Sequence, residues 1–341
     1  MKAAVYYNQQ DIRIEEVPKP KIGEDEILVQ MKACGVCGSD LMDWYLKNRA
    51  PLVLGHEPAG IVARKGRKVR NVSVGDRVFV HHHVACMTCH YCLNGDYTLC
   101  ERFHETNIVP GGFAEYFRVP APNLRLDTLK IPESLPFEQA TLIEPVGCCI
   151  RALKKCGLHY GDSIAVIGAG PTGLIHTALA KTYGASVVIV SDLVDSRLNF
   201  ARKFGADRVI NPKNENLNES VKAETDGRGV DIVVITAPHL EAYKAGIDIC
   251  RKGGKLCMFA PTAPERKLQI SPKELFFSEI CIVPSYSTSH RETRLALDLI
   301  VSGKINFEEL ITHRFKLEET AEAFKTALIG EKSLKVVVLN R

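Results

Sequence analysis

A glycine-rich turn between an apolar segment and a helix-like segment is the feature that most constrains the fold of this 341-residue chain. The apolar segment is 163–167, the helix-like residues are 173–183, and the turn reads Gly168-Ala169-Gly170-Pro171-Thr172-Gly173. In such a turn the first glycine permits the tight bend, the second lets a pyrophosphate approach the backbone, and the third lets helix and strand pack closely. Strand, turn and helix in this order predict a dinucleotide site at the helix N-terminus. The alternative is a glycine turn in a sheet that binds no nucleotide.

The residue at the end of the next apolar segment bears on which nucleotide binds. Asp192 lies about 20 residues beyond the turn, where an acidic residue holds the adenosine ribose. A carboxylate there accepts hydrogen bonds from both ribose hydroxyls and repels the 2′-phosphate of NADP, so NAD is expected. NADP is the alternative, because Arg197 lies nearby and an arginine at this place can bind a 2′-phosphate. The predicted cofactor-binding residues are Gly168, Gly170, Pro171, Thr172, Gly173, Asp192, Arg197 and Thr236.

The hydrophobic pattern divides the chain into two kinds of structure. The first 147 residues or so read as short strands and turns punctuated by Gly and Pro, as in an irregular β-rich domain. Beyond residue 160, apolar segments alternate with helix-like ones, which predicts a parallel sheet with helices on both faces. The expected strands there are 163–167, 186–190, 230–235, 255–259 and 280–283. The polar run 211–219 is expected to be a surface loop.

Four cysteines indicate a first metal site. Cys86, Cys89, Cys92 and Cys100 form a C-x-x-C-x-x-C-x₇-C pattern. Four thiolates in one short loop complete a tetrahedral zinc shell and leave no open position. We therefore predict a structural zinc that orders a loop with little apolar core of its own. The alternative is four free cysteines in a loop.

Three separate segments suggest a second, catalytic zinc site. They read Cys34-Gly35-Val36-Cys37-Gly38-Ser39-Asp40, Gly55-His56-Glu57 and Ile143-Glu144-Pro145. Catalytic zinc usually takes three protein ligands and keeps one exchangeable position, and Cys, His and Glu are suitable donors. Spacing alone does not join the segments, so on this reasoning the second site is a hypothesis.

Composition excludes several classes of function. The net charge is +4 with both signs scattered along the chain, so no nucleic-acid partner is expected. No stretch approaches the ~18 apolar residues of a membrane span, and the N-terminus lacks the apolar core of a signal peptide. Twelve cysteines, four of them at metal-site spacing, fit reduced thiols in the cytoplasm.

With these motifs in view, the chain resembles the zinc-containing medium-chain dehydrogenases over essentially its whole length, and within them the sorbitol (L-iditol) dehydrogenase group. The resemblance is carried by the segments named above and by Ile311-Thr312-His313-Arg314-Phe315. It implies an α/β chain with a GroES-like β-rich catalytic domain (1–147 and 290–341) and a Rossmann domain with a doubly wound parallel sheet (148–289). It also implies an active site in the cleft between the domains, and a homodimer or homotetramer.

The resemblance also implies roles for the residues of the second site. Cys37 and His56 are implied to bind the catalytic zinc, while Glu57 and Glu144 are both candidates for its carboxylate ligand. Ser39 fills the family's hydroxyl position, from which it would pass the alcohol proton toward solvent. The implied reaction is hydride transfer between a polyol or other secondary alcohol and NAD, with two Zn²⁺ per chain. Ser39, Glu57 and Glu144 are the expected catalytic residues.

Two departures from the family pattern bear on the substrate. Five residues after Cys37 the family often has a proton-relaying histidine, and here the residue is Met42. Polyol dehydrogenases often place an arginine near residues 285–287, whereas none occurs here before Arg291. Sorbitol itself is therefore not the expected substrate. The alternatives are an L-threonine dehydrogenase, a simple secondary-alcohol dehydrogenase, and a non-catalytic, crystallin-like nucleotide binder of the kind that lacks zinc ligands.

Three consecutive histidines, His81 to His83, precede the four cysteines. Alternation along an extended segment places His81 and His83 on the same face. Because other residues already account for both metals, we expect these histidines to have a turn or surface role.

Overall fold

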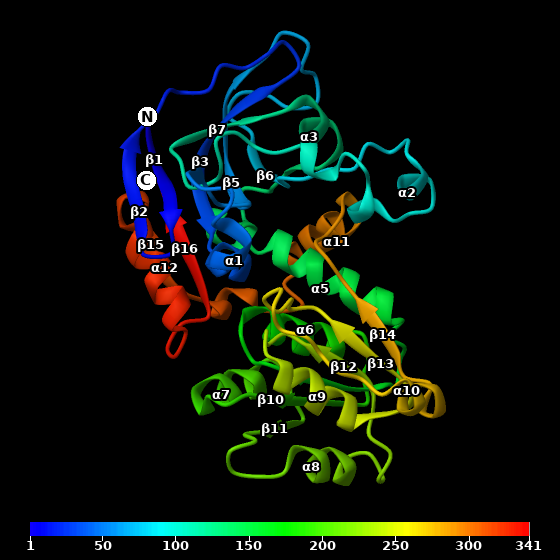
Figure 1. Cartoon of the computed structure of the whole chain (residues 1–341). Coiled ribbons are helices and arrows are strands. Elements are labelled where there is room, and N and C mark those ends of the chain that lie inside the picture. Colours follow the sequence, from blue (N-terminus) through cyan, green and yellow to red (C-terminus); the bar gives the residue numbers. More distant parts are fainter. Residues whose placement is uncertain (341) are drawn as a thin grey trace. The chain divides into compact units, whose positions relative to one another are not determined.

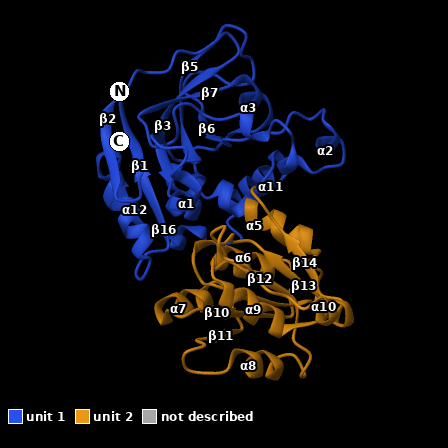
Figure 2. Cartoon of the chain, viewed as in Figure 1, with its two compact units in different colours: residues 1–147, 288–341 blue, residues 148–287 orange. Residues whose placement is uncertain are grey.

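The computed structural model describes residues 1–340 and divides the chain into two compact units (Figures 1 and 2). Unit 1 contains residues 1–147 and the chain from Thr288 onward, and unit 2 contains residues 148–287. The second boundary lies two residues before the predicted one. Unit 1 is therefore assembled from both ends of the chain, with unit 2 inserted in its sequence.

Unit 1 is built mainly from antiparallel strands. A seven-stranded sheet has the order β15-β16-β3-β5-β6-β8, with β7 paired to β3 beside this path, and a three-stranded sheet has the order β2-β1-β4. Ile27, Val29 and Met31 of β3 face the same side of the sheet and belong to the main apolar core of unit 1. The strands are β1 (Lys2–Asn8), β2 (Asp11–Glu16), β3 (Ile27–Gly35), β4 (Leu52–Val53), β5 (Glu57–Lys65), β6 (Arg77–Val80), β7 (Tyr116–Val119), β8 (Thr128–Lys130), β15 (Ile311–Lys316) and β16 (Lys335–Leu339).

The helices of unit 1 have between 3 and 12 residues. They are η1 (Gly38–Leu41), α1 (Asp43–Leu46), α2 (His90–Leu93), η2 (Tyr97–Leu99), η3 (Phe103–Glu105), α3 (Ala121–Leu126), α4 (Phe137–Ala140), α11 (His290–Val301), η4 (Phe307–Leu310), η5 (Leu317–Glu319) and α12 (Thr320–Ile329). The first unit boundary falls inside α5 (Ile143–Cys156), which has 14 residues. Within residues 1–340, no helix has the length and apolar character needed to cross a membrane.

Unit 2 is the predicted doubly wound parallel sheet. Its strand order is β11-β10-β9-β12-β13-β14, and every neighbouring pair is parallel. The order reverses between β9 and β12, and dinucleotides bind at this kind of switch point in open α/β sheets. The elements are β9 (Ser163–Ile167), α6 (Pro171–Thr182), β10 (Val187–Ser191), α7 (Asp195–Lys203), β11 (Arg208–Ile210), α8 (Leu217–Ala223), β12 (Val230–Ile235), α9 (Leu240–Ile249), β13 (Cys250–Met258), α10 (Pro272–Ser278) and β14 (Cys281–Pro284).

The predicted loop 211–219 is wrong at its C-terminal end, where α8 begins at Leu217. The side chain of Asn216 accepts hydrogen bonds from the backbone amides of Asn218 and Glu219. These bonds satisfy two amides that have no partner within the helix, so Asn216 acts as its N-cap. The polar composition hid the helix, because an N-cap and an exposed face are both polar.

His176 is a buried titratable group of unit 2. It lies on α6, where its Nδ1 donates a 2.7 Å hydrogen bond to the carbonyl of Thr172 and its ring packs edge-on against Phe259. Burial lowers the pKa of His176 to about 4. The folded protein therefore holds this imidazole neutral at pH values where an unfolded chain protonates it.

The stability of the protein should consequently fall as the pH drops from 7 to 4. An unfolded histidine has a pKa of ~6.5, so the unfolded state binds the extra proton in this window, and the loss from His176 alone is about 3 kcal/mol. His176→Leu removes this contribution, and its free energy of unfolding should depend less on pH by that amount. Urea unfolding at pH 7, 5.5 and 4.5 measures it; equal pH slopes for both proteins would contradict the prediction.

Candidate active site

Three donor side chains of unit 1 converge on one point. Cys37, His56 and Glu57 each offer one ligand atom, and these atoms lie within 4.8 Å of one another. Strand pairing brings them together, because β3 and β5 are antiparallel with Gly35 opposite Glu57, and Cys37 follows two residues beyond Gly35. A tetrahedral zinc shell with bonds of ~2.0–2.3 Å requires donors about 3.3–3.8 Å apart. The donor atoms therefore lie at most about 1.5 Å beyond the spacing that a zinc ion requires.

Asp40 orients two of these donors. Its side chain is buried, one carboxylate oxygen lies 3.3 Å from His56 Nδ1, and the other accepts a 3.1 Å hydrogen bond from the backbone amide of Cys37. Burial lowers the pKa of His56, but the charges of Asp40 and Cys37 outweigh it and raise that pKa well above its usual value. With Nδ1 turned to the carboxylate, Nε2 is left for a metal, as in carboxylate–histidine–metal arrangements.

Glu57 also lies against a buried lysine that the sequence analysis missed. Lys335, the first residue of β16, forms an ion pair with Glu57, and their side chains are only 4% and 0% exposed. Gly35 makes room for the pair, because a Cβ atom there would overlap the Glu57 carboxylate and lie 2.8 Å from Lys335 Cε. The only signal in the sequence is a single lysine within the apolar run 334–339.

Opposing effects act on this buried pair. Burial raises the pKa of Glu57, and the charge of Lys335 opposes this without reversing it. Burial lowers the pKa of Lys335, but the charge of Glu57 more than compensates and leaves that pKa raised. Glu144, buried on α5, raises both values further. Among residues 1–340 the converging donors include Glu57 and not Glu144.

Ser39 lies in the same turn as Cys37. It is the second residue of η1, next to Asp40, and its side chain is half-buried. Met42 ends this turn at the position where the family often has a histidine. The turn thus holds a hydroxyl near the donor set, while the proton-relay role of Ser39 stays a prediction.

A turn or surface role was predicted for the three histidines, and the surface part of it is wrong for His81 and His83. Both are buried; His81 Nδ1 lies 2.8 Å from a carboxylate oxygen of Asp127, and His83 Nδ1 donates a 2.5 Å hydrogen bond to the Thr106 carbonyl. The other Asp127 oxygen accepts a 2.7 Å hydrogen bond from Thr293. A buried imidazole needs such partners. The partners of these histidines lie 46 and 23 residues further along the chain, where no local pattern reveals them.

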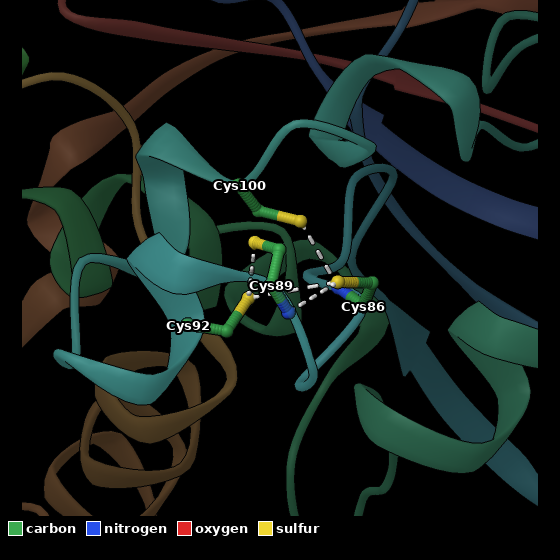
Figure 3. Close-up of side chains that lie close together, drawn as sticks. All are labelled: Cys86, Cys89, Cys92 and Cys100. Carbon is green, nitrogen blue, oxygen red and sulfur yellow. Dashed lines mark hydrogen bonds between the residues drawn. The ribbon is translucent and has the colours of Figure 1, made fainter.

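The predicted four-cysteine site is assembled in the lobe that contains α2 and η2 (Figure 3). Its four sulfur atoms lie within 4.8 Å of one another. The sulfur of Cys86 accepts hydrogen bonds from the amides of Thr88 and Cys89, and the sulfur of Cys100 accepts one from the amide of Cys86. Amide donors of this kind stabilise thiolates, which are the form of cysteine that binds metal. The donor set and its surroundings therefore fit zinc.

The four thiols of the lobe form two pairs whose pKa values are shifted in opposite directions. Hydrogen bonds from Thr88 lower the pKa of Cys86 to about 6, and the amide of Cys92 lowers that of Cys89. Burial raises the pKa of Cys92 to about 12 and also raises that of Cys100. The local core is small: Ala85, Cys92, Cys100 and Phe103 are its buried members. A lobe with so few apolar side chains depends on cross-links such as a metal for its order.

In unit 2 the glycine turn has the shape that its sequence predicts. Gly168 has φ +106°, and a Cβ atom there would lie 2.6 Å from Thr236 Oγ1. A Cβ atom at Gly173 would overlap the carbonyl of Gly168. At Gly170 a Cβ atom would meet nothing within 4 Å, so this glycine leaves open space in front of the N-terminus of α6. That space fits the phosphates of a dinucleotide.

Asp192, directly after β10, is tied to the turn. Its two carboxylate oxygens accept hydrogen bonds of 2.7 and 2.9 Å from the amides of Ala169 and Val194, and Arg197 Nη1 lies 3.8 Å from it. Each carboxylate oxygen keeps a further lone pair for a ribose hydroxyl. The Thr236 hydroxyl lies within hydrogen-bond distance of the backbone carbonyls of Ile167 and Gly168, 3.1 and 2.9 Å away. Thr236, the residue directly after β12, therefore braces the start of the turn.

Two alanine substitutions should separate nucleotide binding from folding. Gly170→Ala adds a methyl group into open space, so thermal stability should hardly change while the Kd for NADH rises. Gly173→Ala forces a methyl group into the Gly168 carbonyl and should destabilise the protein by about 1–3 kcal/mol. Thermal unfolding and fluorescence titration with NADH measure the two effects. Unchanged NADH affinity in Gly170→Ala would show that the turn does not carry the phosphates.

Two family models match this chain. The alcohol dehydrogenase GroES-like domain matches residues 23–133, and the zinc-binding dehydrogenase domain matches residues 171–302. Sorbitol dehydrogenase of Bacillus subtilis (strain 168) is 36% identical and covers 99% of this chain and 97% of its own. Alcohol dehydrogenase of Geobacillus stearothermophilus is 35% identical and covers 99% of both chains.

A solved structure agrees with these matches. The alcohol dehydrogenase TADH from Thermus sp. ATN1 has a TM-score of 0.89 and 29% identity, and the match covers 100% of both chains. The chain therefore belongs to the family of zinc-binding alcohol dehydrogenases with a GroES-like domain. Within that family it falls in the sorbitol-dehydrogenase-like group, and it is an oxidoreductase of the alcohol and polyol type. The predicted family and fold class are thereby confirmed.

Proposed function

We propose that this protein is an NAD-dependent dehydrogenase with two zinc ions per chain, and that it oxidises a hydroxyl of a polyol or a related secondary alcohol to the ketone. The convergence of Cys37, His56 and Glu57, with His56 oriented by Asp40, is the observation that carries the proposal. The relatives named sorbitol dehydrogenase and alcohol dehydrogenase support this substrate class. Sorbitol itself is not the expected substrate, because residues 285–287 contain no arginine.

Each metal has its own set of residues. Cys37, His56 and Glu57 would hold the catalytic zinc, and the four cysteines of the lobe would hold the structural one. When bound, zinc would supply a Lewis acid that lowers the pKa of the alcohol, and NAD would supply the hydride acceptor. Glu57 is favoured over Glu144 as the carboxylate ligand because only Glu57 belongs to the converging donors found in residues 1–340.

The neighbouring residues prepare the proton transfer. The Ser39 hydroxyl accepts the proton of the alcohol and passes it on, since a hydroxyl both accepts and donates hydrogen bonds. Asp40 keeps Nε2 of His56 directed at the metal position. Lys335 balances the charge of Glu57 in a site that has no room for water between them.

NAD is the proposed cofactor because Asp192 stands at the end of β10. Its carboxylate lies 3.8 Å from Arg197 and accepts hydrogen bonds from two backbone amides, and it would also accept hydrogen bonds from the ribose hydroxyls. The same negative charge disfavours the 2′-phosphate of NADP. The twelve cysteines, four of them at metal-site spacing, agree with the reducing cytoplasm as the proposed location, and a homodimer or homotetramer is the proposed assembly.

A panel of alcohols tests the reaction directly. NAD⁺ reduction is followed with sorbitol, xylitol, galactitol, arabitol, 2,3-butanediol, L-threonine and 2-butanol, with and without a zinc chelator. Chelator-sensitive oxidation of at least one polyol or diol is the expected result. Oxidation confined to L-threonine or 2-butanol would keep the mechanism but overturn the polyol assignment. A protein that contains zinc and binds NADH but oxidises none of these alcohols would contradict the proposal.

Cysteine variants test the two metal sites separately. Cys37→Ala should lose one of the two zinc ions and all turnover above background while keeping its affinity for NADH. Cys100→Ser should lose the other zinc ion and unfold at a lower temperature. Cys281→Ser, at an exposed cysteine outside both sites, is the matched control and should keep both ions. Zinc content is measured by elemental analysis; substantial activity in Cys37→Ala would overturn the assignment.

A further inference from the structure

A cavity in unit 1 is lined by three positive charges and, among residues 1–340, by no acidic side chain. Its volume of about 350 Å³ lies in the range of sites for small organic ligands, ~300–1,000 Å³. The lining residues are Lys19, Pro20, Lys21, Ile22, Leu28 and Arg64. None of them belongs to the candidate zinc or nucleotide residues, so the cavity has no role in the proposed reaction.

Strand register builds the floor of this cavity. Leu28 of β3 lies opposite Arg64 of β5 on one side and opposite Arg118 of β7 on the other. Directly opposite residues of paired strands point to the same face of the sheet, so both arginine side chains leave the sheet beside the buried Leu28. The neighbouring Ile27 and Val29 point to the other face and enter the core of unit 1.

The segment that precedes β3 forms the wall. Pro18 and Pro20 each fix a backbone φ angle. They alternate with Lys19 and Lys21, whose side chains line the cavity. Lys19 Nζ lies 3.2 Å from the centroid of the Tyr116 ring, a contact that holds the ammonium group without neutralising its charge. The wall therefore presents cations on a restricted backbone, which lowers the entropic cost of binding a ligand.

The charges of the cavity have no acidic partner. Within the described chain, residues 1–340, the three cations of the lining form no ion pair. The carboxylates of Glu24 and Glu26, in the same segment, are engaged by other cations, and Asp25 is not part of the lining. Arg118 Nε, beside the floor, is buried and has no hydrogen-bond partner among these residues. Positive charges gathered in this way repel one another, and a bound anion would relieve the repulsion.

We propose that this cavity binds a soluble organic phosphate monoester. A phosphate monoester carries a charge of about −1.5 to −2 at pH 7 and has three strong acceptor oxygens, which match three cationic donors. Its organic part would pack on Pro20, Ile22 and Leu28, the apolar half of the lining. The ligand is a second one, distinct from the alcohol, because the cavity contains none of the residues assigned to the reaction.

Calorimetric titration with phenyl phosphate tests the proposal. The zinc-loaded protein is saturated with NADH, so that the predicted phosphate site at the N-terminus of α6 is occupied. The wild type should bind phenyl phosphate with a Kd of about 1 mM or lower, and Lys21→Ala and Arg64→Ala should each weaken binding about 10-fold. Lys21→Arg keeps the charge and should bind nearly as well as the wild type. Both alanine variants should fold normally, because they alter exposed side chains.

A double variant elsewhere in unit 1 is the matched control. Arg294→Ala combined with Lys304→Ala removes two exposed cations outside the cavity and should leave the affinity unchanged, whereas the Lys21→Ala, Arg64→Ala double variant should lose binding. Equal weakening in both double variants, or unchanged affinity in both, would overturn the proposal.

Two further results would also contradict it. The first is a wild type that shows no saturable binding of phenyl phosphate at about 10 mM, which is tenfold above the expected Kd. The second comes from vesicles that contain phosphatidic acid, whose headgroup is a phosphate monoester. Binding to these vesicles without binding of phenyl phosphate would assign the cavity to a lipid headgroup and exclude the soluble ligand.

Discussion

The pairing of β3 with β5 is the constraint on which the candidate catalytic site depends. It sets Gly35 opposite Glu57, and only a residue without a Cβ atom leaves space there for the Glu57 carboxylate and the Lys335 chain. The same register brings Cys37, just beyond β3, beside His56, just before β5. A slip of one residue would turn these side chains to the other face of the sheet. The donor set is thus a consequence of strand register.

The candidate catalytic site also buries four charged side chains. Asp40, Glu57, Glu144 and Lys335 are all at most 5% exposed. Removing charges from water costs several kcal/mol for each ion, and pairing offsets only part of that cost. Such a cluster is poor at stabilising a fold but well suited to binding a cation and orienting its ligands. We therefore interpret these four residues as features of function, supported by the apolar core of unit 1.

The sequence predicts those parts of the protein that local patterns determine. The predicted strand 163–167 coincides with β9, and the spacing of the four cysteines predicted their convergence. Lys335 was missed because its partner Glu57 lies 278 positions earlier in the chain, which is the difference between 335 and 57. His81 was misjudged for the same reason, since Asp127 reaches it only in the folded protein. A pair of single residues that are far apart in the sequence produces neither a periodic pattern nor a characteristic spacing from which it could be predicted.

The central claim is that two sets of donors in unit 1 each hold a zinc ion, one of them with an open position for an alcohol. Anomalous diffraction from crystals of the native protein at the zinc edge tests it most directly. The account predicts two peaks per chain, one among the four lobe sulfurs and one bounded by Cys37 Sγ, His56 Nε2 and a Glu57 oxygen. A peak in the lobe alone, with no metal beside Cys37, would contradict it.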